Sequence, residues 1–114
     1  MQRESTRQLK VAKQIQKDLA EIIREKGMAF FDGAMVTVTS VRVSPDLSIA
    51  KVYLSVFPST KAKDVFKIID SKSKSIRGEL GNRVSKQLRV VPELEYFIDD
   101  SLDYVEKIDE LLKK

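Results

Sequence analysis

The sequence predicts an α+β domain in which helices cover one face of a three-stranded sheet. Apolar residues first recur at helical spacing, then alternate at strand spacing over two neighbouring segments, and then return to helical spacing before one last alternating segment. The chain of 114 residues is long enough for one core. We therefore expect a single domain over residues 1–114, with the core over about 5–99 and a C-terminal helix over 100–114.

The first helix is predicted over about residues 6–26. Ser5 and Gln8 match a capping box, in which each side chain accepts a hydrogen bond from the other residue's backbone N–H. Gly27 is expected to close the helix, because glycine adopts the left-handed conformation at helix ends without steric cost. The apolar stripe between these two ends consists of Leu9, Ala12, Ile15, Leu19, Ile22 and Ile23.

Two strands are predicted over residues 36–43 and 49–57, joined by a turn at 44–47. Proline presets φ in this turn and Asp46 bonds the backbone that follows it, so the strands form an antiparallel hairpin. The alternation of the first strand changes phase near Ser40, which indicates a β-bulge. The inward residues of the second strand are Ala50, Val52, Leu54 and Val56.

Two helices with a break between them are predicted next. Pro58 ends the second strand, and Ser59 or Thr60 is expected to cap the following helix. The apolar pattern fails over the alternating Ser and Lys of residues 71–75 and resumes at Ile76, which predicts a kink or break.

A third helix is predicted because Ile76, Leu80, Val84 and Leu88 recur at every fourth position. We expect Val84 and Leu88 to be buried against the second strand of the sheet. Gly78-Glu79-Leu80-Gly81 matches the GXXG loop of one class of RNA-binding domain, but the apolar pattern runs through it without a break. We therefore place this motif inside the helix.

A final strand follows Pro92, with Leu94, Tyr96 and Ile98 on one face. Residues 99–101 offer caps for a short amphipathic tail helix. The apolar positions of that helix are Leu102, Val105, Ile108, Leu111 and Leu112.

Charge is distributed unevenly along the chain, although the net charge is only +4. Residues 71–91 carry six Lys or Arg and one Glu, whereas residues 92–114 carry three Lys and eight Asp or Glu. On a helical wheel, the small and basic residues of the third helix share a face without a carboxylate. They are Lys74, Gly78, Gly81, Asn82, Ser85, Lys86 and Arg89.

This face predicts contact with RNA. Glycine inside a helix costs about 1 kcal/mol, and short side chains ringed by cations let a sugar-phosphate backbone approach closely. A face that is merely solvated is the alternative. The predicted RNA-binding residues are Lys72, Lys74, Arg77, Asn82, Arg83, Lys86 and Arg89, with Arg3, Arg7 and Lys10 near the start of the first helix.

The composition removes the commonest catalytic groups. Without Cys there are no thiolate nucleophiles or Cys zinc sites, and without His the commonest general base is missing. An enzyme would therefore lack most of its usual chemistry here. We expect a monomeric protein without cofactor or metal. No apolar run approaches the length of a membrane span and the opening MQREST does not match a signal peptide, so we expect a cytoplasmic protein without membrane contact.

The predicted order of elements resembles the type II KH domain, an RNA-binding module. Four segments together resemble bacterial ribosome-binding factor A: R-x-x-K-V-A-x-x-I-Q-x-x-L-x-x-I-I (7–23), V-T-V-T-S-V-R-V-S-P-D-L-S-I-A-K-V-Y-L-S-V (36–56), I-R-x-x-L-G (76–81) and V-P-E-L-E-Y-F-I-D-D-S-L (91–102). That family replaces the KH loop with a helix kink at Ala-x-Gly, where this chain has Lys72-Ser73-Lys74.

The resemblance implies a non-enzymatic ribosome assembly factor that binds the small (30S) subunit and assists late maturation of the 5′ end of 16S rRNA, with a role in growth in the cold. Three other hypotheses stay open. The first is a generic KH-like module for other RNA. The second is an enzyme with Mg²⁺ on Asp99, Asp100 and Asp103, although these acids suit a helix N-terminus. The third is a protein-interaction domain whose acidic tail meets a partner, for example an assembly GTPase.

Overall fold

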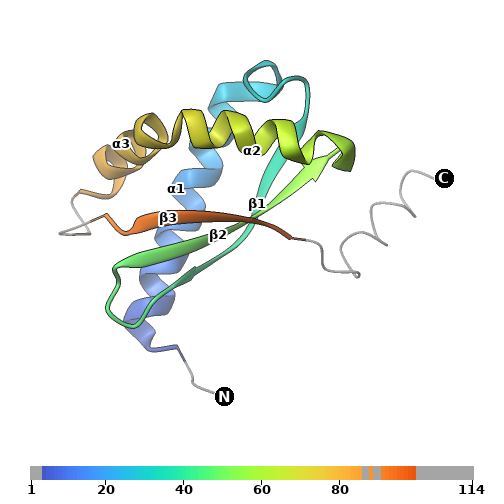
Figure 1. Ribbon diagram of the computed structural model, residues 1–114. Coiled ribbons are helices and arrows are strands. Elements are labelled where there is room, and N and C mark those ends of the chain that lie inside the picture. Colours follow the sequence, from blue (N-terminus) through green and yellow to red (C-terminus); the bar gives the residue numbers. More distant parts are fainter. Residues whose placement is uncertain (1–3, 86–87, 89–90, 100–114) are drawn as a thin grey trace.

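The computed structural model describes residues 4–85, 88 and 91–99, and it confirms the predicted order of elements over that part of the chain (Figure 1). The predicted tail helix lies outside the described residues. The elements are α1 (Thr6–Phe30), β1 (Met35–Val43), β2 (Ile49–Phe57), a 3₁₀ turn (Ser59–Lys61), α2 (Ala62–Ser71), α3 (Ser73–Val84) and β3 (Glu93–Ile98).

The sheet has the order β1-β2-β3, with β1 antiparallel to β2 and β2 parallel to β3. The parallel pair requires a crossover, and the chain makes it through α2 and α3. The pairing of β1 with β2 shifts by one residue between Val38 and Ser40, which confirms the predicted bulge. The bulge keeps Val38 and Val41 on the buried face although they are three positions apart.

Helix α1 begins as predicted. The Ser5 Oγ accepts from the Gln8 N–H at 3.1 Å, and the Ser5 N–H donates to the Gln8 Oε1 at 2.8 Å. Gly27 interrupts the helix with φ 76° and ψ 175°, and one further turn then reaches Phe30. The positive φ of Gly27 confirms that this glycine interrupts the helix. The predicted end at residue 26 is too early, because one more helical turn follows the glycine.

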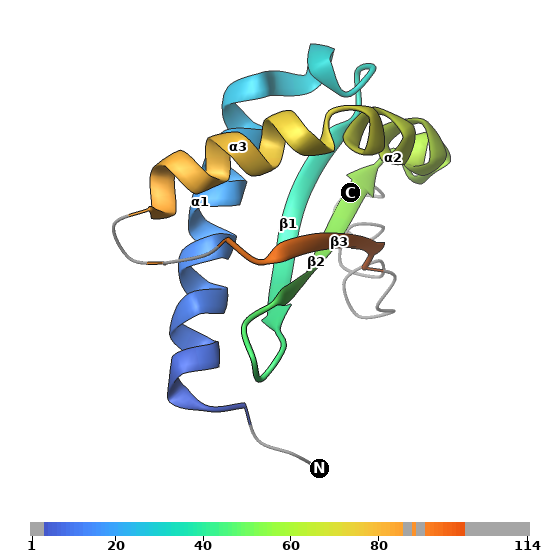
Figure 2. The ribbon, with the colours of Figure 1, turned by 60° about the vertical axis from the view of Figure 1, so that its left-hand side comes forward.

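One hydrophobic core joins the helices to the buried face of the sheet. Ile15 and Leu19 of α1, Leu54 of β2 and Leu80 of α3 are all fully buried. The turned view shows α1 running alongside β1 (Figure 2). In β2 the predicted inward residues Ala50, Val52, Leu54 and Val56 are all buried.

Two local predictions about the helices are wrong. Neither Ser59 nor Thr60 caps α2, because residues 59–61 form a 3₁₀ turn and α2 begins at Ala62 without a side-chain cap. Helix α3 ends at Val84, so Leu88 lies beyond it and is only half-buried, although its N–H still bonds the Val84 carbonyl at 2.8 Å. The chain has to turn back toward β3 here, and that reversal overrides the apolar periodicity.

Candidate nucleic-acid interface

The break between α2 and α3 occurs at Lys72, within the predicted Ser/Lys segment. The Lys72 N–H closes α2 by donating to the Ile68 and Ile69 carbonyls, and the Lys72 carbonyl opens α3 by accepting from the Ile76 N–H at 2.9 Å. The side chains of Lys72 and Lys74 are exposed. The structure therefore presents two lysines at the junction where a KH domain carries its backbone-binding loop.

The glycines of Gly78-Glu79-Leu80-Gly81 lie inside α3, as predicted. A Cβ on Gly81 would meet the Val91 Cγ2 at 3.3 Å, so this glycine lets the chain before β3 pass close to the helix. A Cβ on Gly78 would meet nothing within 4 Å. Packing thus explains Gly81, whereas Gly78 lies on an open surface.

Two arginines among the predicted RNA-binding residues, at the margins of the predicted face, make contacts within the protein. One Arg77 guanidinium nitrogen donates to the Val91 carbonyl at 2.8 Å. Arg83 bridges α3 to α1, with one nitrogen 3.1 Å from the Glu21 carboxylate and another 2.6 Å from that of Glu25. The pKa of Arg83 is raised above its ordinary value, mainly by the hydrogen bond to Glu25. These contacts fix α3 against α1 and the segment before β3.

The other predicted positions divide into two groups. Asn82, Arg7 and Lys10 are exposed in the structure. Lys86, Arg89 and Arg3 lie outside the described residues. RNA contact at all ten positions stays a prediction.

The structure extends the predicted basic positions at the start of α1 into a longer line, of which Lys17 and Arg24 were not predicted. Lys10, Lys13, Lys17 and Arg24 are all exposed, and their spacing of three, four and seven residues places them along one side of the helix. We call these four residues the α1 basic stripe. Over the described part of the chain, none of them forms an ion pair. The stripe spans roughly 21 Å at 1.5 Å per residue.

Each carboxylate of α1 has a hydrogen-bond or ion-pair partner that is not part of this stripe. Asp18 is buried and its carboxylate accepts from the Gln14 side chain at 2.7 Å. Glu21 and Glu25 bind Arg83. The helical period of the basic residues was visible in the sequence, but the pairing of Glu21 and Glu25 with Arg83 depends on the docking of α3.

The hairpin carboxylate Asp46 has a structural role. It accepts from the Ser44 hydroxyl at 2.7 Å and from the hydroxyl and N–H of Ser48 at 2.7 and 3.1 Å. These hydrogen bonds lower the pKa of Asp46 to about 2. Among the residues that the structure describes, no group of three or more acidic side chains is placed to hold a metal ion, and no helix has the length and apolarity of a membrane span.

The sequence model of the ribosome-binding factor A family matches residues 7–112. The chain belongs to this family. The ribosome-binding factor A of Flavobacterium johnsoniae is 47% identical over 113 residues, which cover 96% of this chain and 85% of the relative. That of Cytophaga hutchinsonii is 40% identical over 111 residues, which cover 97% of this chain and 84% of the relative.

Solved structures of ribosome-binding factor A share the fold. The crystal structure from Thermus thermophilus gives a TM-score of 0.68 at 24% identity, covering 80% of this chain and 94% of that one. A homology model of the Thermus thermophilus ribosome-binding factor A was fitted into a cryo-EM map of a 30S complex. It gives a TM-score of 0.62 at 26% identity, covering 75% of this chain and 87% of that one. The α+β fold and the family predicted from the sequence are therefore confirmed.

Proposed function

We propose that this protein binds the small (30S) ribosomal subunit in the cytoplasm and assists late maturation of 16S rRNA, including its 5′ end, without catalysing a reaction. Membership of the ribosome-binding factor A family carries the proposal. The Thermus thermophilus relative, at 26% identity, is described as part of a 30S complex. We expect the protein to act as a monomer and to matter most in the cold, and we include an assembly GTPase as a proposed partner.

The charge distribution of the described surface supports contact with folded RNA. The α1 basic stripe provides four cations in a line, and Lys72 and Lys74 add two more at the helix break. Phosphate contacts of this kind are independent of base sequence, and a handful of them gives micromolar or weaker affinity at physiological salt. Selective binding then requires an RNA surface whose shape places several phosphates at once, which a maturing subunit offers.

The proposed RNA contacts fall into two classes. Arg7, Lys10, Lys72, Lys74 and Asn82 act through exposed side chains. Arg77 and Arg83 act mainly by holding α3 in place, through the contacts described above. Arg3, Lys86 and Arg89 complete the proposed set.

The test compares the affinity for purified small subunits with the affinity for protein-free 16S rRNA at one salt concentration. We expect tighter binding to the subunit. Equal affinity for both would favour a general KH-like RNA-binding module instead. In cells that lack the protein, we expect precursor 16S rRNA and unjoined subunits to accumulate, most clearly in the cold. A normal 16S rRNA 5′ end in those cells would contradict the maturation role.

A further inference from the structure

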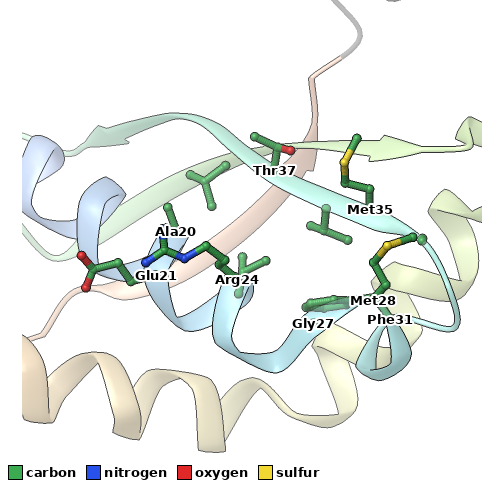
Figure 3. Close-up of a pocket in the computed structure, with 12 residues that line it drawn as sticks. Ala20, Glu21, Arg24, Gly27, Met28, Phe31, Met35 and Thr37 are labelled. Carbon is green, nitrogen blue, oxygen red and sulfur yellow. The ribbon is translucent and has the colours of Figure 1, made fainter. Parts of the chain in front are cut away.

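A groove opens between the C-terminal half of α1 and the start of β1 (Figure 3). Its walls are α1 residues 20–28 and β1 residues 35–38, and the buried side chains of Phe31 and Ala34 form its floor. The groove holds about 440 Å³. We call it the α1/β1 groove. Its lining is mostly apolar, which is typical of sites that bind a ligand or a peptide.

Two methionines stand exposed at one end of this groove. Met28 from α1 is 56% exposed and Met35 from β1 is 52% exposed, and both lie at the end away from Glu21 (Figure 3). Exposed apolar side chains that gather beside a pocket mark interaction sites. Methionine is common on such surfaces, because its flexible thioether adapts to different apolar partners.

The backbone of β1 is open along the same stretch. β1 is an edge strand of the sheet, and α1 covers the second half of its free edge with side-chain amides. Gln8 Nε2 donates to the Val43 carbonyl at 2.9 Å, and Gln16 Nε2 donates to the Thr39 carbonyl at 3.3 Å. Within the described residues, no side chain donates to a carbonyl of residues 35–38.

The reason lies in the residues of α1 that line the groove here. Ala20 and Gly27 carry no side chain long enough to reach the strand. Alternate residues of a β-strand turn their N–H and C=O to the same side, so this part of the edge can pair with another extended chain. The groove thus combines an open strand edge with an apolar wall, as do domains that bind peptides by strand addition.

The charges at the groove indicate the chemistry of the partner. Glu21 shares the single positive charge of Arg83 with Glu25, whereas Arg24 is exposed and has no ion pair among the described residues. Lys17 extends the positive charge along α1. A carboxylate on the bound chain would complement Arg24. RNA fits less well, because a sugar-phosphate chain does not match the alternating donors and acceptors of a strand edge.

We propose that the α1/β1 groove binds an extended peptide segment of a partner protein, with apolar residues alternating with acidic ones. The segment adds a strand beside residues 35–38, places apolar side chains against Met28 and Met35, and directs a carboxylate to Arg24. This site goes beyond the proposed contact with the ribosomal subunit and does not depend on it.

The test uses ¹⁵N-labelled full-length protein and a pool of acetylated, amidated pentapeptides. The peptides carry Val, Ile or Leu at positions 1, 3 and 5 and Asp or Glu at positions 2 and 4. A control pool has Pro at position 3, which removes a backbone donor from the added strand. We expect saturable amide shifts in residues 20–28 and 34–38 with the first pool, and at least about tenfold weaker binding with the second.

Two matched variants place a lysine inside and outside the groove. Ala20→Lys fills the groove from an exposed position of α1, and Ala29→Lys adds the same charge at an exposed position that does not line it. We expect the first to lose peptide binding at least about tenfold and the second to keep it. Because Ala20→Lys also enlarges the α1 basic stripe, its affinity for RNA should stay equal or rise.

The proposal is overturned if neither peptide pool shifts the groove amides, if both pools bind equally, or if Ala20→Lys keeps full peptide binding. It is also overturned if an RNA hairpin produces the same shifts in the groove and Ala20→Lys strengthens them, because the occupant would then be RNA. Failure of the ribosomal proposal would appear separately, as equal affinity for subunits and free 16S rRNA.

Discussion

Removal of three of the four cations of the α1 basic stripe is the most direct test of the RNA surface. The variant combines Lys10→Ala, Lys13→Ala and Lys17→Ala. All three side chains are exposed without an ion pair in the described structure, and alanine has the highest helix propensity. We therefore expect the thermal unfolding midpoint, followed by circular dichroism, to stay close to that of the unmodified protein.

The expected loss of RNA affinity follows from counterion release. Each lost phosphate contact lowers the slope of log K against log salt by about 0.7–0.9, so three contacts lower it by roughly 2–3. At 0.1 M salt this corresponds to roughly 10²-fold weaker binding. The measurement is fluorescence anisotropy of a labelled RNA hairpin, titrated at several salt concentrations between about 50 and 200 mM.

The control removes the same charge elsewhere, through Lys51→Ala, Lys63→Ala and Lys67→Ala on β2 and α2. These three lysines are also exposed, and none forms an ion pair among the described residues. We expect a much smaller change in slope for this variant. An unchanged slope in the stripe variant would refute the reasoning, because the stripe would then be merely solvated. An equal change of slope in both variants would refute it as well, because the stripe would then act only through its share of the net charge.

The other predictions concern the core, the third helix and the hairpin turn. Leu80→Ala should lower the free energy of unfolding by about 2–5 kcal/mol and half-buried Leu88→Ala by less, and equal losses in urea titrations would contradict the structure. Gly78→Ala should raise the unfolding free energy by about 0.5–1 kcal/mol because its Cβ enters open space. A large loss of RNA affinity in that variant would show that the backbone of an RNA approaches there. The pKa of Asp46 falls from 3.8 to about 2 on folding, so its stabilisation is complete above about pH 4 and is lost as the pH falls through about 2. An Asp46→Asn variant should lack this part of the dependence of stability on pH. A pKa of Asp46 near 3.8, measured by NMR titration of its carboxyl group, would contradict this prediction.

Local patterns in the sequence predicted most of the fold. The capping box at Ser5, the bulge near Ser40 and the break near Lys72 each depend on a few neighbouring residues, and all three are confirmed. The end of α3 was predicted wrongly, because the periodicity up to Leu88 does not show where the chain must turn back to reach β3. The cap predicted at Ser59 or Thr60 was also wrong, because a 3₁₀ turn separates these residues from the start of α2.

The candidate site was predicted less completely than the fold. Exposure of Lys72, Lys74 and Lys10 agrees with their predicted role. The sequence did not indicate that Arg83 binds Glu21 and Glu25, because these residues are about sixty positions apart. The spacing of the basic residues on α1 is present in the sequence, but whether acids of the same helix neutralise them depends on where α3 docks.

The sequence by itself determined the fold class, the family and the uneven distribution of charge along the chain, because short-range periodicity, turn chemistry and composition encode them. Only the tertiary structure decided which cations are available. Docking of α3 on α1 joins Arg83 to two carboxylates and leaves the α1 basic stripe without ion pairs among the described residues. The same packing sets Ala20 and Gly27 along the groove beside the free edge of β1 and creates the α1/β1 groove. Both results depend on distances between residues remote in sequence, which no local pattern contains.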